Sequence, residues 1–186
     1  MFNLLNINSV RPIVREVLHY KKSGSALDLG CGAGRHALFL AKKGFRVTAL
    51  DNRSESLAAL KELARLQKLP ITIKRVDAVT YASKRKFDII LSTMVLHFLP
   101  KLIHKNTIIK MQKNTKKRGL NVLSSYTDKN KNGTRPHLVH AGALKRAYEK
   151  TGWTILKHRE GLGKPQKNAA GKIIRYWTEE LIAQKP

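Results

Sequence analysis

Short apolar or alternating runs along the chain are separated by longer segments whose apolar residues recur about every three to four positions. The short runs predict strands, and they cover residues 26–29, 46–50, 71–76, 87–91 and 119–126. The longer segments predict helices, and they cover residues 9–20, 34–43, 54–68, 101–114 and 141–150. In the third of these helices Leu57, Leu60 and Leu63 share one face, and Ser9 is the predicted N-cap of the first.

Two further strands, 153–160 and 172–183, are predicted on either side of a loop rich in glycine, proline and asparagine. Repeated strand–helix units followed by a terminal hairpin predict an α/β fold. Its sheet is doubly wound and mostly parallel, with the antiparallel hairpin at one edge. No repeat or linker divides the 186 residues, so residues 1–186 are expected to form a single domain.

The first predicted strand runs into the glycine loop Asp28-Leu29-Gly30-Cys31-Gly32-Ala33-Gly34. Glycines let a backbone turn sharply and approach a ligand closely, and the helix that follows points its N–H groups at the turn. A dinucleotide loop reads Gly-x-Gly-x-x-Gly, but Arg35 stands where its third glycine belongs. The carboxylate of Asp28 repels a pyrophosphate and suits a cofactor with an ammonium and a sulfonium. The alternative is a glycine-rich turn without a ligand.

Acidic residues also end the next two predicted strands. Asp51 lies about 20 residues past the loop, where a carboxylate accepts hydrogen bonds from ribose hydroxyls. Its alternative role is at a helix N-terminus, with Asn52 and Glu55 as a capping box. Asp77-Ala78 ends the third strand, and a surface turn is its alternative interpretation.

The scarcity of acids makes these positions informative. The chain has 37 Lys and Arg but only 12 Asp and Glu. Asp28, Asp51, Asp77 and Asp88 all stand at ends of predicted strands, three of them at carboxyl ends. Ligands of open α/β sheets bind at that edge.

The pattern acidic-x-Gly-x-Gly-x-Gly resembles motif I of the class I S-adenosylmethionine (SAM) methyltransferases. Residues 87–99 and 111–119 further resemble the TehB-type tellurite-resistance methyltransferases, and the likeness extends from about Val10 to Lys185. The resemblance implies a seven-stranded Rossmann-like sheet and SAM as the cofactor. The implied cofactor residues are Asp28, Gly30, Cys31, Gly32, Gly34, Asp51, Asn52, Asp77, Ala78, Ser92 and Thr93. Asp77 would contact the adenine amino group.

The segment from Ser92 to His97 leaves the fourth strand at the cofactor edge, where we expect it to border the sulfonium. His97 is the candidate catalytic residue, because histidine can take a proton from a thiol or hydroxyl near neutral pH. The alternative is a histidine packed against a helix, since methyl transfer to a soft nucleophile depends mainly on placement.

The terminal hairpin departs from the TehB pattern. TehB-type proteins carry a His-Arg pair in its loop, where this chain has Pro165-Gln166, and a later arginine where this chain has Trp177. Lys172 and Arg175 are possible substitutes. This departure argues against activity on tellurium oxyanions, and it leaves the cofactor loop unchanged. Further candidates for the acceptor side are Tyr126, His137, His140, Arg146, Tyr176 and Trp177.

The formal charge of +25 leaves two classes of methyl acceptor open. Basic runs at 84–86, 116–118 and 129–131 favour a nucleic-acid partner, and hence an RNA methyltransferase. Only 6% of residues are aromatic and no RNA-binding module is recognisable, which favours a small soft or anionic acceptor such as a thiol or chalcogen oxyanion. No metal site is expected, because His137-x-x-His140 lacks further ligands.

The single cysteine, Cys31, excludes an internal disulfide and fits a reducing compartment. We interpret it as a small residue beneath the cofactor, with a nucleophilic thiol at a helix N-terminus as the alternative. The chain shows neither a signal-peptide pattern nor an apolar run of the ~20 residues that a membrane span needs. A cytoplasmic monomer or homodimer is therefore expected.

Overall fold

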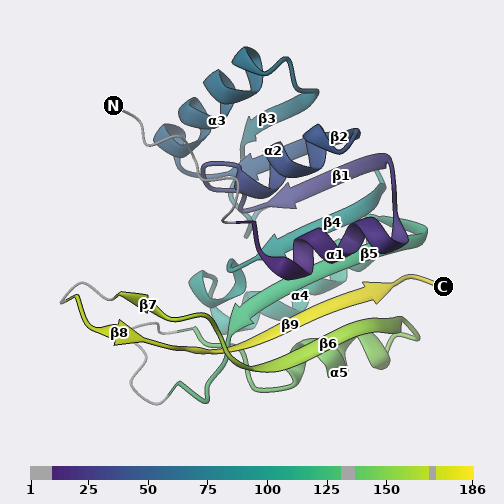
Figure 1. Cartoon of the computed structure of the whole chain (residues 1–186). Helices are drawn as coiled ribbons and strands as arrows, with labels where there is room; N and C mark the ends of the chain where they lie inside the picture. The colour runs from purple at the N-terminus through teal and green to yellow at the C-terminus, as the bar shows by residue number, and fades with distance from the viewer. Residues whose placement is uncertain (1–9, 131–136, 168–170) are drawn as a thin grey trace.

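A computed structural model of the protein describes residues 10–130, 137–167 and 171–186. Its main sheet has seven strands in the order β3-β2-β1-β4-β5-β9-β6 (Figure 1). The strands are β1 (Gly24–Leu29), β2 (Phe45–Asp51), β3 (Ile71–Arg75), β4 (Phe87–Thr93), β5 (Thr115–Tyr126), β6 (Thr154–Leu162) and β9 (Trp177–Gln184). The helices are α1 (Pro12–Tyr20), α2 (Arg35–Lys42), α3 (Ser54–Leu66), α4 (Lys101–Lys113) and α5 (Ala143–Glu149), with a 3₁₀ turn η2 (Leu96–Phe98) after β4.

The predicted α/β fold class is confirmed. Strands β1 to β5 pair in parallel, whereas β9 runs antiparallel to both of its neighbours, β5 and β6. Chain order reverses between β1 and β4, so the carboxyl ends of these two strands flank a switch point of the kind where open sheets bind ligands.

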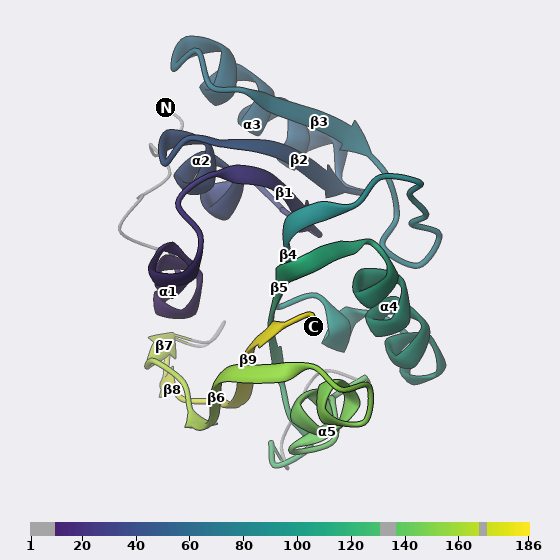
Figure 2. The ribbon, with the colours of Figure 1, turned by 90° about the vertical axis from the view of Figure 1, so that its right-hand side faces the viewer.

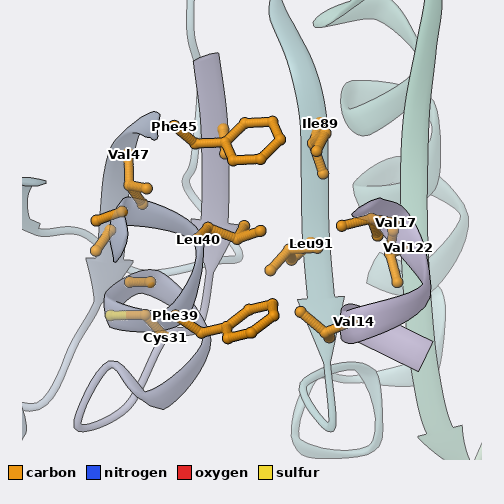
Figure 3. Packing of buried hydrophobic residues seen from close by; sticks show 14 of the residues in the cluster. Val14, Val17, Cys31, Phe39, Leu40, Phe45, Val47, Ile89, Leu91 and Val122 are labelled. Atoms are coloured by element: carbon orange, nitrogen blue, oxygen red, sulfur yellow. The ribbon is translucent and has the colours of Figure 1, made fainter. Parts of the chain in front are cut away.

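Helices cover both faces of the sheet (Figures 1 and 2). The core on one face joins α1, α2 and α3 to the strands; Figure 3 shows Val14 and Val17 of α1 and Phe39 and Leu40 of α2 packed around Leu91 of β4. The core on the other face joins η2, α4 and α5 to the strands. Because both faces are covered, the central strands are apolar almost throughout.

Differences from the predicted elements lie mostly at their ends. β5 begins at Thr115, four residues before the predicted start, and the last strand begins at Trp177. Residues 173–174 pair instead with 166–167 in a separate two-stranded sheet, β8 (Ile173–Ile174) with β7 (Gln166–Lys167). Ser9 lies outside the described residues, and the N-cap of α1 is Arg11 followed by Pro12.

Among the described residues, no helix is both long enough and apolar enough to cross a membrane.

Candidate active site

The glycine loop joins β1 to α2 at the carboxyl edge of the sheet. Gly30, Gly32 and Gly34 have φ angles of 72°, 55° and 81°, a region that other residues rarely adopt. A Cβ on Gly30 would lie 2.5 Å from Val95 Cγ2, and one on Gly34 would lie 2.3 Å from Leu60 Cδ1. Close packing therefore requires the first and third glycines. At Gly32 the nearest neighbour is the Arg53 guanidinium, 3.2 Å from such a Cβ, so this glycine leaves the loop open toward a ligand.

Asp28 lies at the base of this loop, in β1. Only 1% of it is exposed, and neither carboxylate oxygen makes a hydrogen bond of good geometry with the described residues. Burial raises the pKa of the carboxyl from its ordinary 3.8 to about 7, although the Ala37 backbone N–H and the Arg35 charge both favour the charged form. A buried carboxylate whose hydrogen bonding is incomplete is costly. The ammonium of a SAM molecule lying on the glycine loop matches this unmet demand in charge and in hydrogen bonding.

Asp51 ends β2 and is also buried. Its Oδ2 accepts a hydrogen bond from the Gly32 N–H at 2.7 Å, and its Oδ1 accepts one from the Arg53 N–H at 3.0 Å. The Arg53 side chain adds an ion pair at 3.4 Å. The carboxylate thus ties the glycine loop to the start of α3. The predicted capping box of Asn52 and Glu55 is wrong, because the N-cap of α3 is Arg53 and no side-chain hydrogen bond caps it.

Asn52 and Asp77 come together at the same edge of the sheet. Both are exposed, and Asn52 Nδ2 donates to Asp77 Oδ2 at 3.4 Å. The other oxygen of Asp77 accepts the Val79 N–H at 2.8 Å, as in an Asx turn. Asp77 therefore stabilises a local turn, and because it also lines a hollow beside the loop, its role as a ligand residue stays a prediction.

Two adjoining hollows, each of about 290 Å³, lie beside the loop and share Gly30, Arg53 and Met94. The first combines polar groups with apolar walls; its other lining residues are Asp51, Asn52, Val76, Asp77, Ala78, Val95, Phe98 and Leu99. The second lies over the loop; its other lining residues are Cys31, Gly32, Ala33, Arg35, His36 and Thr93. The first has the composition of a nucleoside pocket, and the second continues it over the glycine loop.

Met94 links the two hollows; the sequence predicted it only as part of the segment from Ser92 to His97 and not as a cofactor residue. Its φ is 60°, an unusual value for a residue with a side chain, and its N–H donates to the Ser124 carbonyl at 2.7 Å. Thr93 lines the second hollow. Ser92 is fully buried behind it, and its hydroxyl lacks a partner among the described residues.

The Cys31 thiol is buried at the second hollow, where its sulfur lies 3.5 Å from the Gly32 carbonyl oxygen. Burial, reinforced by the charges of Asp28 and Asp51, raises the pKa of the thiol. A thiol that stays protonated is a poor nucleophile. The structure therefore favours the interpretation of Cys31 as a small residue beneath a ligand.

His97 lies in η2 and is 1% exposed. Its Nδ1 is 3.2 Å from the Ser125 hydroxyl, and its ring packs between those of Phe98 and Tyr126 at centroid distances of 4.5 and 4.6 Å. Phe98 lines the first hollow and Tyr126 a third cavity, so His97 lies in the wall between them. A role as proton acceptor stays a prediction.

The third cavity has a volume of about 500 Å³ and is lined mainly by the start of α1 with the two residues before it, by β6 and β9, and by the segment after β6. Its charged lining residues are Arg11, Arg35, Arg159, Lys164 and Glu180. The single carboxylate, Glu180, pairs with Arg11 at 3.2 Å. The lining is therefore cationic overall. The half-buried Arg35 also lines the second hollow, so it forms a wall common to both.

Some residues predicted for the acceptor side line this cavity. Tyr126 and Tyr176 do, with ring centroids 4.9 Å apart. Pro165, which stands where the family has part of its His-Arg pair, lines the cavity too. Others have partners elsewhere: His140 pairs with Asp128 at 2.6 Å, and Arg146 donates to the Ala141 carbonyl at 2.9 Å.

The remaining candidates lie apart. Trp177 packs under the Lys129 ammonium, 4.8 Å from the ring centroid. His137 is half-buried, and Lys172 and Arg175 are exposed beside β8. The basic lining residues Arg11, Arg35 and Arg159 were missed, because nothing in their local sequence distinguishes them from the other 34 Lys and Arg of the 37. Arg35 was noted only as a departure from a dinucleotide loop.

Comparison with known proteins agrees with this geometry. Residues 2–177 match the family described as tellurite resistance protein TehB. The chain belongs to the TehB family. The expectation from its sequence is thereby confirmed. The crystal structure of TehB from Haemophilus influenzae superimposes with a TM-score of 0.88 at 26% identity, over 95% of this chain and 63% of that one.

Curated relatives give a similar result. A probable S-adenosyl-L-methionine-dependent methyltransferase TehB of Haemophilus influenzae (strain 10810) is 30% identical over 86% of this TehB-family chain and 56% of its own length. A protein named Hemagglutinin 1, from Eikenella corrodens, is 29% identical over 93% of this chain and 58% of its own. The chain thus spans less than two thirds of the length of these relatives.

Proposed function

We propose that this protein is a SAM-dependent methyltransferase. The observation that carries the proposal is the buried carboxylate of Asp28, whose hydrogen bonding is incomplete, beneath a glycine loop that opens onto two joined hollows. The name of the Haemophilus influenzae relative, a probable S-adenosyl-L-methionine-dependent methyltransferase, supports the same cofactor and activity.

Different residues of the chain would bind different parts of the cofactor. Asp28 would hold the ammonium of the cofactor, while Gly30, Cys31, Gly32 and Gly34 shape the loop beneath its methionine part. Asp51 has both oxygens engaged by backbone N–H groups, which fixes its remaining lone pairs in position to accept from ribose hydroxyls. Around the adenine, Asp77 and Asn52 would supply polar contacts, and Ala78 and Phe98 an apolar wall.

SAM, when bound, supplies a methyl group activated on a positively charged sulfur. Thr93, Met94 and Arg35 border the second hollow, where that sulfur would lie, and Ser92 supports them from behind. Placement of the acceptor in line with the methyl group is the main contribution that such a site makes to the rate.

The acceptor would enter through the third cavity. Its positive lining favours a small anionic or soft acceptor, either a thiolate or a chalcogen oxyanion, because a cationic mouth raises the local concentration of anions. Two tyrosines at its wall suit a compact acceptor with some apolar surface. Pro165-Gln166 stands where TehB-type proteins carry a His-Arg pair, so the guanidinium groups of Arg11, Arg35 and Arg159 would supply the positive charge instead.

Calorimetry tests the cofactor directly. SAM and S-adenosylhomocysteine should bind with one-to-one stoichiometry and NAD should not. The Asp28→Asn variant should bind SAM more weakly than the wild type, while a matched change at an exposed acid on α3, Glu62→Gln, should not alter the affinity. Binding of NAD without a signal from SAM would refute the proposal.

A further inference from the structure

The amino edge of the sheet, opposite the glycine loop, carries a dense group of cations. We call it the basic edge, and it comprises Lys84, Arg85, Lys86, Lys113, Lys116, Lys117, Arg118 and Lys185. These residues come from the loop before β4, the end of α4, the start of β5 and the segment after β9. Figure 2 views the molecule from this side, with the start of β4 and β5 and the C-terminus near its centre.

Hydrogen bonds hold these segments together. Asn114 Nδ2 donates to the Ser83 and Arg85 carbonyls at 2.7 and 3.0 Å, and the Asn114 carbonyl accepts the Phe87 N–H at 2.8 Å. The loop before β4 is thus fixed to the start of β5. The segment after β9 is fixed there too, because the Arg118 N–H donates to the Lys185 carbonyl at 3.1 Å and the Lys185 N–H to the Gly119 carbonyl at 2.9 Å.

A bulge in β5 projects three of the cations. Phe87 of β4 is paired with Thr115 and Ile89 with Leu120, so the intervening residues of β5 loop out of the ladder. Arg118 adopts a φ of 56°, a left-handed conformation that costs energy in any residue with a side chain. A Cβ on Gly119 would lie 2.8 Å from the Lys116 carbonyl oxygen, so the bulge depends on this glycine. Local strain is therefore maintained where positive charge is presented.

Little negative charge balances this surface. Asp88 lies beside it but is engaged by Lys116 Nζ at 2.8 Å and by the Ser25 N–H at 2.7 Å. Six of the cations are exposed and form no ion pair with any described carboxylate; they are Lys84, Arg85, Lys86, Lys113, Lys117 and Arg118. Asp28, Asp51 and Asp77 lie at the opposite edge.

The basic edge is also extended. Lys68, Lys43 and Lys22 precede β3, β2 and β1, so they continue it across the neighbouring strands. Strands in a sheet are about 4.8 Å apart, which gives a row of roughly 25 Å from β3 to β9. A row of this length matches roughly seven successive phosphates along one strand of a duplex, taking the spacing of 3.4 Å along the helix axis that holds for DNA.

We propose that the basic edge binds the phosphate backbone of a nucleic acid that is not the methyl acceptor. An extended row of cations, six of which form no ion pair with a described carboxylate, matches a linear array of phosphates and carries no base readout. The segments that carry the eight residues of the basic edge contain none of the exposed large apolar side chains that a lipid surface would take up alongside the charge; Tyr20 and Leu66 are exposed only near Lys22 and Lys68, where the row continues. The site also lies away from the hollows where the cofactor is proposed, so the two functions are independent.

Fluorescence anisotropy with a labelled RNA duplex tests the proposal on the whole chain. The triple variant Lys84→Gln, Lys86→Gln, Lys117→Gln should bind at least about tenfold more weakly near physiological salt, and its log–log salt slope should fall by about 2 to 3, as for the loss of three phosphate contacts. The control Lys61→Gln, Lys74→Gln, Lys105→Gln removes the same charge from exposed positions elsewhere and should have little effect on either quantity. Both variants should keep the wild-type Tm and methyl-transfer rate.

Three results would overturn it. The first is no RNA binding by the wild type, and the second is an equal loss in both triple variants, which would show a diffuse charge effect. The third is tighter binding to phosphatidylserine-containing vesicles than to RNA. Methyl incorporation into the bound RNA would refute its separation from the acceptor. Binding is measured without SAM, so failure of the methyltransferase proposal would leave this test intact.

Discussion

At the scale of single residues, Asp28 carries the greatest consequence. Its carboxyl has a pKa of about 7 in the folded protein against an ordinary 3.8, because burial disfavours the charged form. The folded state therefore binds more protons than the unfolded state between these values, and stability falls as pH rises through that window. The cost of ionising the group at higher pH is roughly 4 kcal/mol, and a cation placed beside it would recover part of that cost.

The first prediction follows from this linkage. Without SAM, the Asp28→Asn variant should lose the fall in unfolding free energy between about pH 4 and pH 7, and at pH 8 it should be the more stable protein. The same change should weaken SAM binding. Urea unfolding at pH 5 and pH 8 measures the first effect, with Asp77→Asn, at an exposed site, as the control. An unchanged pH dependence in Asp28→Asn would show that the carboxyl ionises freely in the fold.

His97 gives the second prediction. If His97 removes a proton from the substrate that receives the methyl group, His97→Asn should lower kcat by about 10²-fold or more while SAM affinity is retained. The pH–rate profile should also lose a step near neutrality. Ser125→Ala removes the hydroxyl that holds Nδ1 and should shift that step while keeping it. Full turnover with a lowered Tm in His97→Asn would assign the residue to packing.

At the scale of elements, helix α2 must cross α3 closely for the glycine loop to form. A methyl group on Gly34 would overlap Leu60 on α3 at 2.3 Å, and the φ of 81° adds backbone strain. Loop geometry and helix packing are therefore set by the same residue.

The third prediction concerns this crossing. Gly34→Ala should lower the unfolding free energy by about 2–4 kcal/mol, combining overpacking with strain. Gly44→Ala, at a φ of 88° with nothing within 4 Å, should show the strain alone, about 1 kcal/mol. Adding Leu60→Ala to Gly34→Ala should relieve the overlap, and a double-mutant cycle in urea measures the coupling. Additive effects would contradict a direct clash.

The elements themselves were largely predictable, because parallel strands covered on both faces read as short apolar runs between amphipathic helices. Their ends were harder to predict. The start of β5 was missed because Lys116, Lys117 and Arg118 do not read as a strand, although Thr115 pairs with Phe87. The edge of the sheet where we propose that the cofactor binds could be predicted from Asp28, Asp51 and Asp77, because these residues stand at carboxyl ends of strands.

The third cavity depends on contacts between distant segments, which local sequence does not encode. Arg11, the N-cap of α1, and Glu180 from β9 meet across 169 positions of the chain, and Arg159 from β6 lines the same cavity. Surface basic residues are so common in this composition that a pattern could not single these out.

At the scale of the whole molecule, charge is divided between two edges of one sheet. β4 has seven residues, so its ends lie roughly 20 Å apart at about 3.3 Å per residue. A polyanion held on the basic edge is therefore remote from the hollows beside the glycine loop.

The fourth prediction uses this separation. With labelled SAM, the methyl group should be transferred to a small thiol or chalcogen oxyanion, while tRNA and rRNA stay unlabelled near physiological salt. Neutralising Lys84, Arg85 and Lys86 should leave turnover of the small acceptor unchanged. Stoichiometric labelling of RNA that these substitutions abolish would instead identify an RNA methyltransferase.

Arg35 stands in the wall between the second hollow and the third cavity. Because Arg35 borders both proposed binding sites, a ligand in one of them changes the surroundings of this side chain in the other. The free energies of binding at the two sites are therefore linked. By thermodynamic reciprocity, the factor by which one ligand tightens the other is the same in both directions. The saturation curve for SAM should therefore depend on the acceptor concentration, and that for the acceptor on the SAM concentration. S-adenosylhomocysteine should dissociate more readily once the methylated acceptor, which has lost its negative charge, has left.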